Sequence, residues 1–414
     1  MSITIFEDRR VESLYPVTVG RPAFATTCGG MRLVDQLKHV GAPLRAAVRP
    51  HLKDIVQQDF PELLNGDAPG SVNTLTLLVN ARLVPSVSAR RQLEGLPDEG
   101  RPGIVRDTSG ISAVLLPQGT APSEISLEPA NVERYLESIS LEELSAKLPL
   151  IEWPHDFVRH HLASIEANSM AHVGSGQFRQ LSDGVFLGEG AILGQHVITD
   201  ASRGPIIIDR GASIGPFSYL RGPVYIGPGA RVTEHSALKD GVSVGHTSKI
   251  GGEVEASIIE PFTNKQHHGF LGHSYLGSWV NLGAGTCNSD LKNTYGIVKM
   301  EYGGQKISTD MQFVGAIVGD YAKTAINTGI FTGKTIGVCS MVYGFVTTNV
   351  PSFVNYARLF GQVTTAPVEV MVATQARMFA RRKVNQRPCD VQHMHELTHH
   401  EREVGEFPPE PLSL

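Results

Sequence analysis

The sequence is poor in cysteine and has no long apolar run. Its four cysteines, Cys28, Cys287, Cys339 and Cys389, are scattered, and no two of them have the CxxC spacing of a zinc site. This usage excludes a disulfide framework and is typical of a reducing cytoplasm. No apolar run approaches the roughly 18 residues that a membrane-spanning helix needs. The amino-terminal segment MSITIFEDRR lacks an apolar signal core, so we expect no secretion signal.

Positive charge is not in excess either. The 36 basic and 41 acidic residues give a formal net charge of −5, which argues against a general nucleic-acid-binding protein. Hydrophobic residues make up 41% and charged residues 19% of the chain, which excludes wholesale disorder. A length of 414 residues is enough for two or three domains with their own cores.

Glycine, by contrast, is abundant and local. Thirty of the 43 glycines lie between Gly174 and Gly344. In that region aliphatic residues recur every six positions without a slip. Short strands with one inward aliphatic each, and glycines at the turns, predict a β-solenoid rather than a β-sandwich with glycine-rich turns. The eight consecutive members are Ile208, Ile214, Leu220, Ile226, Val232, Leu238, Val244 and Ile250.

The six-residue repeat breaks twice. The first break contains EPFTNKQHHGF (260–270), and the second contains CNSDLKNTYGIVKMEYGGQKISTD (287–310). Insertions in a solenoid become loops on one face, which is often the binding face. Both segments carry lysine and asparagine, and the first carries two adjacent histidines. We therefore expect the chemistry of the chain to lie in these loops.

The first 170 residues have a different pattern. Short apolar strands, at 3–6, 75–80 and 113–117, alternate with helical stretches at 32–40 and 124–148, which predicts an α/β domain. A connecting helix follows Trp153-Pro154, and the segment after Pro367 has an amphipathic helical pattern. These patterns predict an α/β domain at 1–170, a β-solenoid at 171–360 and a helical tail at 361–414.

Two solenoid segments carry a resemblance to a known family. The repeat as a whole resembles the hexapeptide acyltransferases, which implies a left-handed parallel β-helix. IGPFSYLR (214–221) and FLGHSYLGSWVNLGAGT (270–286) resemble the bifunctional UDP-N-acetylglucosamine pyrophosphorylase / glucosamine-1-phosphate N-acetyltransferase family, in its alternative bacterial branch. The resemblance implies an acyltransferase that uses acetyl-CoA on an amino sugar-1-phosphate. It also implies a cytoplasmic homotrimer with sites between solenoids, and neither nucleic-acid nor membrane partners.

The resemblance also implies individual site residues. The catalytic base falls on His267, where a neutral imidazole suits proton transfer near neutral pH. His268 and His273 remain alternatives. Arg221 falls on a phosphate-binding arginine, and Lys265 is the candidate for a family lysine that this sequence lacks. The other matched positions are Asn281 and Asn288 for the sugar, and Ala284 and Ala316 for the coenzyme.

The resemblance also implies a nucleotide-sugar site in the amino-terminal domain. Arg21, in LYPVTVGRP, and Arg32, in CGGMR, match positions that would meet phosphate. Nucleotidyl transfer also needs a carboxylate for Mg²⁺, but the strand LTLLVN ends in Asn80 where an aspartate is expected. An active pyrophosphorylase and a non-catalytic sugar-nucleotide-binding or scaffold protein therefore both remain open.

One further motif competes with this interpretation. Residues 395–399 read HELTH, which fits the HExxH pattern of zinc peptidases. A zinc peptidase also needs a third ligand and a substrate cleft, and only fifteen residues follow His399. We therefore expect no structural or catalytic metal at this motif.

Overall fold

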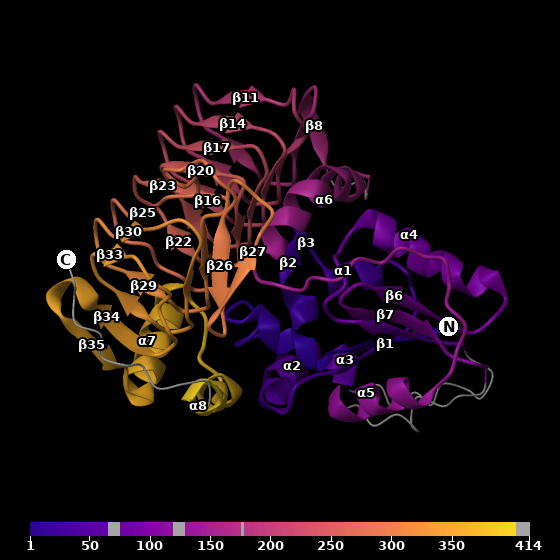
Figure 1. The fold of residues 1–414 in the computed structure, drawn as a ribbon. Helices are drawn as coiled ribbons and strands as arrows, with labels where there is room; N and C mark the ends of the chain where they lie inside the picture. The colour runs from indigo at the N-terminus through magenta and orange to yellow at the C-terminus, as the bar shows by residue number, and fades with distance from the viewer. Residues whose placement is uncertain (65–74, 119–128, 175–177, 403–414) are drawn as a thin grey trace.

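The computed structural model describes residues 1–64, 75–118, 129–174 and 178–402 (Figure 1). An α/β domain is followed by a parallel β-solenoid and then by carboxy-terminal helices, so the expected fold class is confirmed. In Figure 1 the α/β domain, in indigo and purple, lies beside the solenoid rather than beyond its end. No helix among the described residues is long and apolar enough to cross a membrane.

The α/β domain is built on one five-stranded sheet in the order β4-β1-β5-β7-β6. The strands β4, β1 and β5 are parallel, and β7 runs antiparallel to both β5 and β6. The central strands are buried on both faces, which explains why LTLLVN is mostly apolar. The strands are β1 (Ser2–Phe6), β4 (Leu44–Ala47), β5 (Thr76–Asn80), β6 (Gly103–Asp107) and β7 (Gly110–Leu115), with a small hairpin of β2 (Thr27–Cys28) and β3 (Met31–Arg32). The helices are α1 (Leu33–Lys38), α2 (Lys53–Asp59), α3 (Pro61–Leu64), α4 (Val87–Gly95) and α5 (Pro129–Ser138).

The long helix predicted over 124–148 is wrong in its second half. Residues 119–128 lie outside the described part, α5 ends at Ser138, and the chain then runs extended. The amide of Leu144 donates to the carbonyl of Ile104 (2.8 Å), and Leu144 and Leu148 are buried against the sheet. Burial of these leucines on an open sheet edge outweighed the helical spacing of the segment.

The solenoid has three faces of stacked strands, which are parallel except for one antiparallel end strand on the first face and one on the second. The aliphatic residues of the repeat point inward and are buried. The first face contains β8 (Arg179–Ser182), β9 (Val185–Leu187), β12 (Ile206–Ile208), β15 (Val224–Ile226), β18 (Val242–Val244), β21 (Ile258–Ile259), β24 (Tyr275–Leu276), β28 (Ala316–Val318) and β31 (Lys334–Ile336). The second face contains β10 (Ile192–Leu193), β13 (Ser213–Ile214), β16 (Arg231–Val232), β19 (Lys249–Ile250), β22 (Asn264–Lys265), β29 (Lys323–Thr324), β32 (Met341–Val342), β34 (Val354–Ala357) and β35 (Gln362–Thr365). The third face contains β11 (Ile198–Asp200), β14 (Tyr219–Arg221), β17 (Ala237–Lys239), β20 (Glu253–Glu255), β23 (Phe270–Gly272), β25 (Cys287–Asn288), β30 (Gly329–Ile330) and β33 (Phe345–Val346).

The first predicted insertion is not an insertion. Residues 264–265 form β22, which pairs in register with β19, so the coil continues through EPFTNKQHHGF. The spacing between inward residues merely shortens, from Ile250 to Val254 and then to Ile259, before it returns to six. Only residues 266–269, between β22 and β23, form a loop.

The second predicted insertion is a hairpin arm of β26 (Lys299–Tyr302) and β27 (Gln305–Ser308). The ring of Tyr302 stacks on Trp153 with centroids 5.4 Å apart, and its hydroxyl lies 3.0 Å from Nδ1 of His155. Figure 1 shows the arm lying toward the α/β domain. The arm therefore joins the two domains, and the binding role predicted for this segment stays a prediction.

Two helical segments complete the packing. The connecting helix α6 (Asp156–Val173) is confirmed and packs against the first face, where His172 contacts Tyr225. The predicted helical tail is confirmed as α7 (Val368–Arg381) and α8 (Pro388–Arg402). Helix α7 lies on the second face, where Phe379 stacks on Trp279 at 4.4 Å, and α8 reaches the α/β domain.

Candidate functional site

The loop that carries the predicted base is held from inside the solenoid. Lys265 pairs in register with Ile250, so its side chain takes an inward position that the repeat gives to an aliphatic residue. Its ammonium group reaches the corner of the coil and donates to the backbone carbonyls of Gly251 (2.7 Å), His267 (2.9 Å) and Gly269 (2.8 Å). Burial lowers the pKa of Lys265 to about 8, which still leaves the ammonium form dominant at neutral pH.

The three candidate histidines do not lie together. His267 and His268 are exposed on the loop before β23, whereas His273 follows this strand at its other end. Nδ1 of His273 lies 2.9 Å from a carboxylate oxygen of Asp290, and its ring stacks on Phe313. His267 and His268 thus share one corner of the solenoid, and the His273–Asp290 pair occupies a different one.

Three predicted contact residues have structural roles here. All three ammonium hydrogens of Lys265 are used by carbonyl groups, so this lysine is not placed to bind a phosphate. The Asn288 carboxamide accepts from the amide of Gly272 (2.9 Å) and donates to its carbonyl (3.0 Å). Ala316 is wholly buried in β28. The coil register turns each of these side chains into the solenoid or along its ladder, and their roles toward a ligand stay predictions.

The predicted phosphate-binding residue, Arg221, lies on the third face, several strands before β23. Arg221, Lys239, Glu255 and Gly272 pair in sequence across four neighbouring strands, so Arg221 is three strands, about 14 Å, from the end of β23. Its guanidinium forms an ion pair with Asp240, and Nε donates to this carboxylate over 2.9 Å. Lys239, one coil below Arg221, forms ion pairs with Glu253 (2.7 Å) and Glu255 (3.4 Å).

A basic cavity opens beside the histidine loop. Its volume is about 230 Å³, and it lies between the second face of the solenoid and α7. The predicted residue Asn281 lines it, as does Gln266, which directly precedes His267. Ala284, by contrast, lies in the turn before β25, where its carbonyl accepts from the amide of Asn327 (2.7 Å). The cations that line the cavity are Lys249, Lys323, Arg381 and Arg382.

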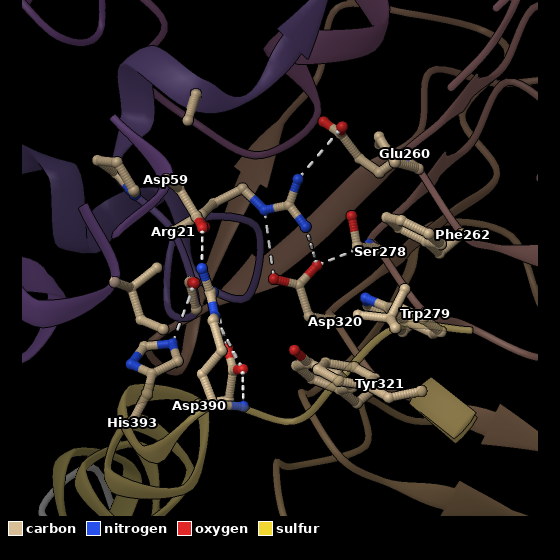
Figure 2. Close-up of a pocket in the computed structure, with 18 of the residues that line it drawn as sticks. Arg21, Asp59, Glu260, Phe262, Ser278, Trp279, Asp320, Tyr321, Asp390 and His393 are labelled. Atoms are coloured by element: carbon tan, nitrogen blue, oxygen red, sulfur yellow. Dashed lines mark hydrogen bonds and ion pairs between the residues drawn. The ribbon is translucent and has the colours of Figure 1, made fainter. Parts of the chain in front are cut away.

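A larger cavity, of about 400 Å³, lies where the α/β domain, the solenoid and the tail meet (Figure 2). Arg21 enters it from the loop after β1 and is largely buried. Its guanidinium bonds both carboxylate oxygens of Asp320 (3.2 and 2.5 Å) and forms an ion pair with Glu260 (3.2 Å). The tail closes the cavity through Arg387, which bonds Asp59 of α2 (2.6 Å) and Asp390 of α8. The predicted nucleotide contact Arg21 is thus engaged by carboxylates of the solenoid.

Arg32 lies on the wall of the same cavity. Its guanidinium makes two hydrogen bonds to Asp35, at 2.7 and 2.9 Å, and lies over the ring of Phe60. About two-fifths of its side chain is exposed, so it is freer than Arg21 to meet a ligand. Both predicted nucleotide contacts therefore line one cavity, but only Arg21 forms an ion pair between the two domains.

The resemblance implies Mg²⁺ in the amino-terminal domain, but the residues at the strand ends do not fit it. The buried carboxamide of Asn80 donates to Asp8 (2.8 Å) and accepts from the amide of Arg82 (2.9 Å). The fully buried guanidinium of Arg82 bonds both oxygens of Asp8. A resident guanidinium therefore neutralises the carboxylate nearest to Asn80. Among the described residues no group of three or more histidine, cysteine or acidic side chains could hold a metal ion.

The HExxH motif lies in α8, which begins at Pro388. The side chain of His399 is outside the described residues. The neighbouring His393 is buried, and its ring nitrogens lie 3.2 Å from the carbonyl of His51 and 3.1 Å from that of Gly20. The described part of this helix thus packs against the α/β domain.

Comparison with known proteins gives a family match in the α/β domain and several similar proteins. Residues 3–172 match the sugar nucleotidyl transferase family. A bifunctional sugar-1-phosphate nucleotidylyltransferase/acetyltransferase of Sulfurisphaera tokodaii is 35% identical over 143 residues, which cover 34% of this chain and 36% of the relative. The bifunctional protein GlmU of Methanococcus vannielii is 31% identical over 131 residues, covering 32% of this chain and 28% of the relative.

These alignments span about a third of the relatives' own length. Among solved structures, the chain is similar to an Arabidopsis UDP-N-acetylglucosamine acyltransferase with a TM-score of 0.23 and 12% identity, over 54% of this chain and 91% of the other. The chain therefore matches the sugar nucleotidyl transferase family over residues 3–172, which is less than half of its length, and is similar, over about a third of its length, to bifunctional nucleotidylyltransferase/acetyltransferase proteins.

Proposed function

We propose that this protein transfers the acetyl group of acetyl-CoA to the amine of an amino sugar-1-phosphate, with glucosamine-1-phosphate as the first substrate to test. The observation that carries the proposal is the exposed His267 on a loop whose carbonyls are held by the buried Lys265 ammonium. A fixed backbone orients an imidazole at low entropic cost while its ring stays accessible. The relatives named as acetyltransferases support the same chemistry.

The reaction needs one base and one leaving group. The amine nitrogen attacks the thioester carbonyl carbon, so a C–N bond forms and the C–S bond breaks. His267 accepts the proton that the amine loses, and this proton ends on the departing thiolate, which leaves as coenzyme A thiol. Asn281, beside the loop, offers its carboxamide to a sugar hydroxyl. In this proposal His268 is the alternative base at the same corner, and His273 the alternative at the other.

For the amino-terminal domain we propose UDP-sugar formation from the sugar-1-phosphate. Its match to the sugar nucleotidyl transferase family supports this activity. Arg32 and, after release from Asp320, Arg21 would contact phosphate. Because the carboxylate nearest to Asn80 is already paired with Arg82, we assign no step to Mg²⁺. The same pairing favours a second candidate function, in which the domain binds a sugar nucleotide without turnover and serves as a scaffold.

We also propose that the working form is a cytoplasmic homotrimer. Five large apolar side chains, each at least half exposed, lie on the second and third faces or at their edges, away from the first face that the α/β domain covers. Contact between solenoids would bury them and close the His267 corner from solvent. None of the four cysteines forms a disulfide, which supports a reducing compartment. The five residues are Ile192, Ile198, Phe217, Phe331 and Phe345.

The proposal is tested by thiol release from acetyl-CoA with glucosamine-1-phosphate, other amino sugar phosphates and UDP-sugars as acceptors. Release that depends on an amino sugar phosphate supports it. The absence of acceptor-dependent release from folded protein contradicts it. UTP-dependent pyrophosphate release, measured in parallel with and without Mg²⁺, separates an active amino-terminal domain from one that only binds.

A further inference from the structure

The basic cavity has an unusual charge balance. Lys249 and Lys323 come from the second face, and Arg381 and Arg382 come from the end of α7. No carboxylate lines the cavity among the described residues. The buried guanidinium groups of Arg21 and Arg82, by contrast, are paired with Asp320 and Asp8. Four cations without an acid make this cavity distinct.

These cations lie together without a carboxylate among the described residues of the cavity lining, and one of them, Lys323, donates to the backbone carbonyl of Tyr321 (2.8 Å). Burial lowers the pKa of Lys249, and the nearby Arg382 and Arg381 lower it further. Burial also lowers the pKa of Lys323. The dipole of α7 would favour cations at its carboxy-terminal end. It does not explain why two solenoid lysines lie opposite them, so a bound anion is the simplest source of compensation.

A neutral acceptor completes the site. The carboxamide of Asn264 donates to Asn281 (2.8 Å), and its own oxygen is buried without a hydrogen-bond donor in the described structure. A buried amide oxygen without a donor is costly, and a hydroxyl or amine of a ligand would satisfy it. The cavity thus offers four cationic donors for an anion and one acceptor for a neighbouring hydroxyl or amine.

We propose that this cavity binds the phosphate group of a phosphorylated ligand through Lys249, Lys323, Arg381 and Arg382, with Asn264 accepting from a hydroxyl or amine beside that phosphate. The ligand is either the sugar-1-phosphate or the phosphate-bearing end of coenzyme A, since both present the same anion. The identity of the ligand rests on the proposed function, whereas the anion site itself does not. The site also supplies what Lys265 and Arg221 do not, because these two cations are engaged by carbonyls and by Asp240.

Direct binding tests the proposal without turnover. Calorimetric titrations of the full chain use inorganic phosphate, glucosamine-1-phosphate, glucosamine, coenzyme A and 3′-dephospho-coenzyme A. The double variant Arg381→Gln/Arg382→Gln removes two cations, and Arg377→Gln, on the same helix but outside the cavity, is the matched control. We expect the double variant to weaken binding of one phosphorylated ligand at least tenfold, and the control to stay within twofold. Lys323→Gln should weaken the same ligand, and unchanged circular dichroism shows that the variants fold.

The pattern of losses identifies the source of the phosphate. A loss confined to glucosamine-1-phosphate assigns the cavity to the sugar phosphate. A loss of affinity for coenzyme A in the double variant assigns the cavity to the coenzyme. If the loss is smaller for 3′-dephospho-coenzyme A, the cavity binds the 3′-phosphate. Equal affinities of wild type and double variant for every phosphorylated probe overturn the proposal. If the protein shows no acetyl transfer but the double variant still loses ligand binding, the anion site is supported and only the proposed function is contradicted.

Discussion

The ammonium group of Lys265 donates to the backbone carbonyl of His267 across 2.9 Å, from a position inside the solenoid. It reaches the carbonyl of Gly269 from the same position, so one buried cation fixes both sides of His268. The loop that carries the proposed base thus depends on a residue that is almost wholly buried. Lys265 is a positioning residue in this arrangement.

Replacement of Lys265 by methionine tests this role. Methionine fills the inward position, where its neighbours in the column are aliphatic, so we expect the fold to be retained. The loop loses three hydrogen bonds, and a displacement of about 1 Å at a catalytic group lowers kcat about tenfold to hundredfold. Acetyl transfer by Lys265→Met should therefore fall by this factor with little change in KM.

The matched control is Lys239→Met on the third face, which removes a lysine that pairs with Glu253 and Glu255 on the surface. Lys239→Met should keep most of the activity. Wild-type kcat in Lys265→Met, with the His267 loop ordered, would show that the ammonium does not position the base.

Arg21 should contribute much more to stability than Arg32. Removing its guanidinium leaves the carboxylates of Glu260 and Asp320 buried without this partner, which costs about 3–5 kcal/mol. Arg32 pairs with Asp35 at the surface, where such a pair contributes about 0–1 kcal/mol. Urea unfolding of Arg21→Ala and Arg32→Ala measures both. Similar losses for the two variants would show that the junction does not depend on the buried ion pair.

Acid should loosen the same junction through His161. Its Nδ1 accepts from the amide of Gly29 (2.9 Å), and its Nε2 donates to the carbonyl of Gly241 (3.0 Å), so the ring is neutral and links the α/β domain to the solenoid. Burial lowers its pKa from 6.5 to about 4. The unfolded chain therefore binds this proton first, and stability falls as the pH drops from about 6.5 to 4, by about 3 kcal/mol.

The variant His161→Gln isolates this effect, since a carboxamide can make both hydrogen bonds but does not titrate in this range. The free energy of unfolding, measured from pH 7 to 4.5 for both proteins, should fall more steeply for the wild type. Parallel curves would remove His161 as the source of acid sensitivity.

The oligomeric state tests the proposed contact between solenoids. Light scattering after gel filtration should give three times the chain mass of 44.7 kDa. Charges at the exposed Phe331 and Phe345 would be buried without partners in the trimer, so Phe331→Glu/Phe345→Glu should yield monomers that are still folded. A wild-type monomer at micromolar concentration would contradict the trimer.

The solenoid could be predicted because each coil repeats one local rule, an inward aliphatic every six residues with glycines at the turns. The role of Lys265 could not be predicted. The spacing between inward residues is shorter than six at Val254 and Ile259, and this shift gives an inward position to a lysine. The partner of Arg21 is 299 residues away in sequence, and Arg381 reaches the second face only through docking of the tail. Such contacts follow from tertiary packing, which carries no local sequence pattern.

The most direct measurement is the single-turnover rate of acetyl transfer to glucosamine-1-phosphate by the wild type and by His267→Ala, His268→Ala and His273→Ala. If His267 is the base, its variant should lose about 10²–10⁴-fold in rate, with the other two near wild type. Binding of glucosamine-1-phosphate, measured separately, should be kept in all four proteins. A His267→Ala protein that turns over at the wild-type rate, beside an inactive His273→Ala, would contradict the assignment and move the chemistry to the His273–Asp290 pair.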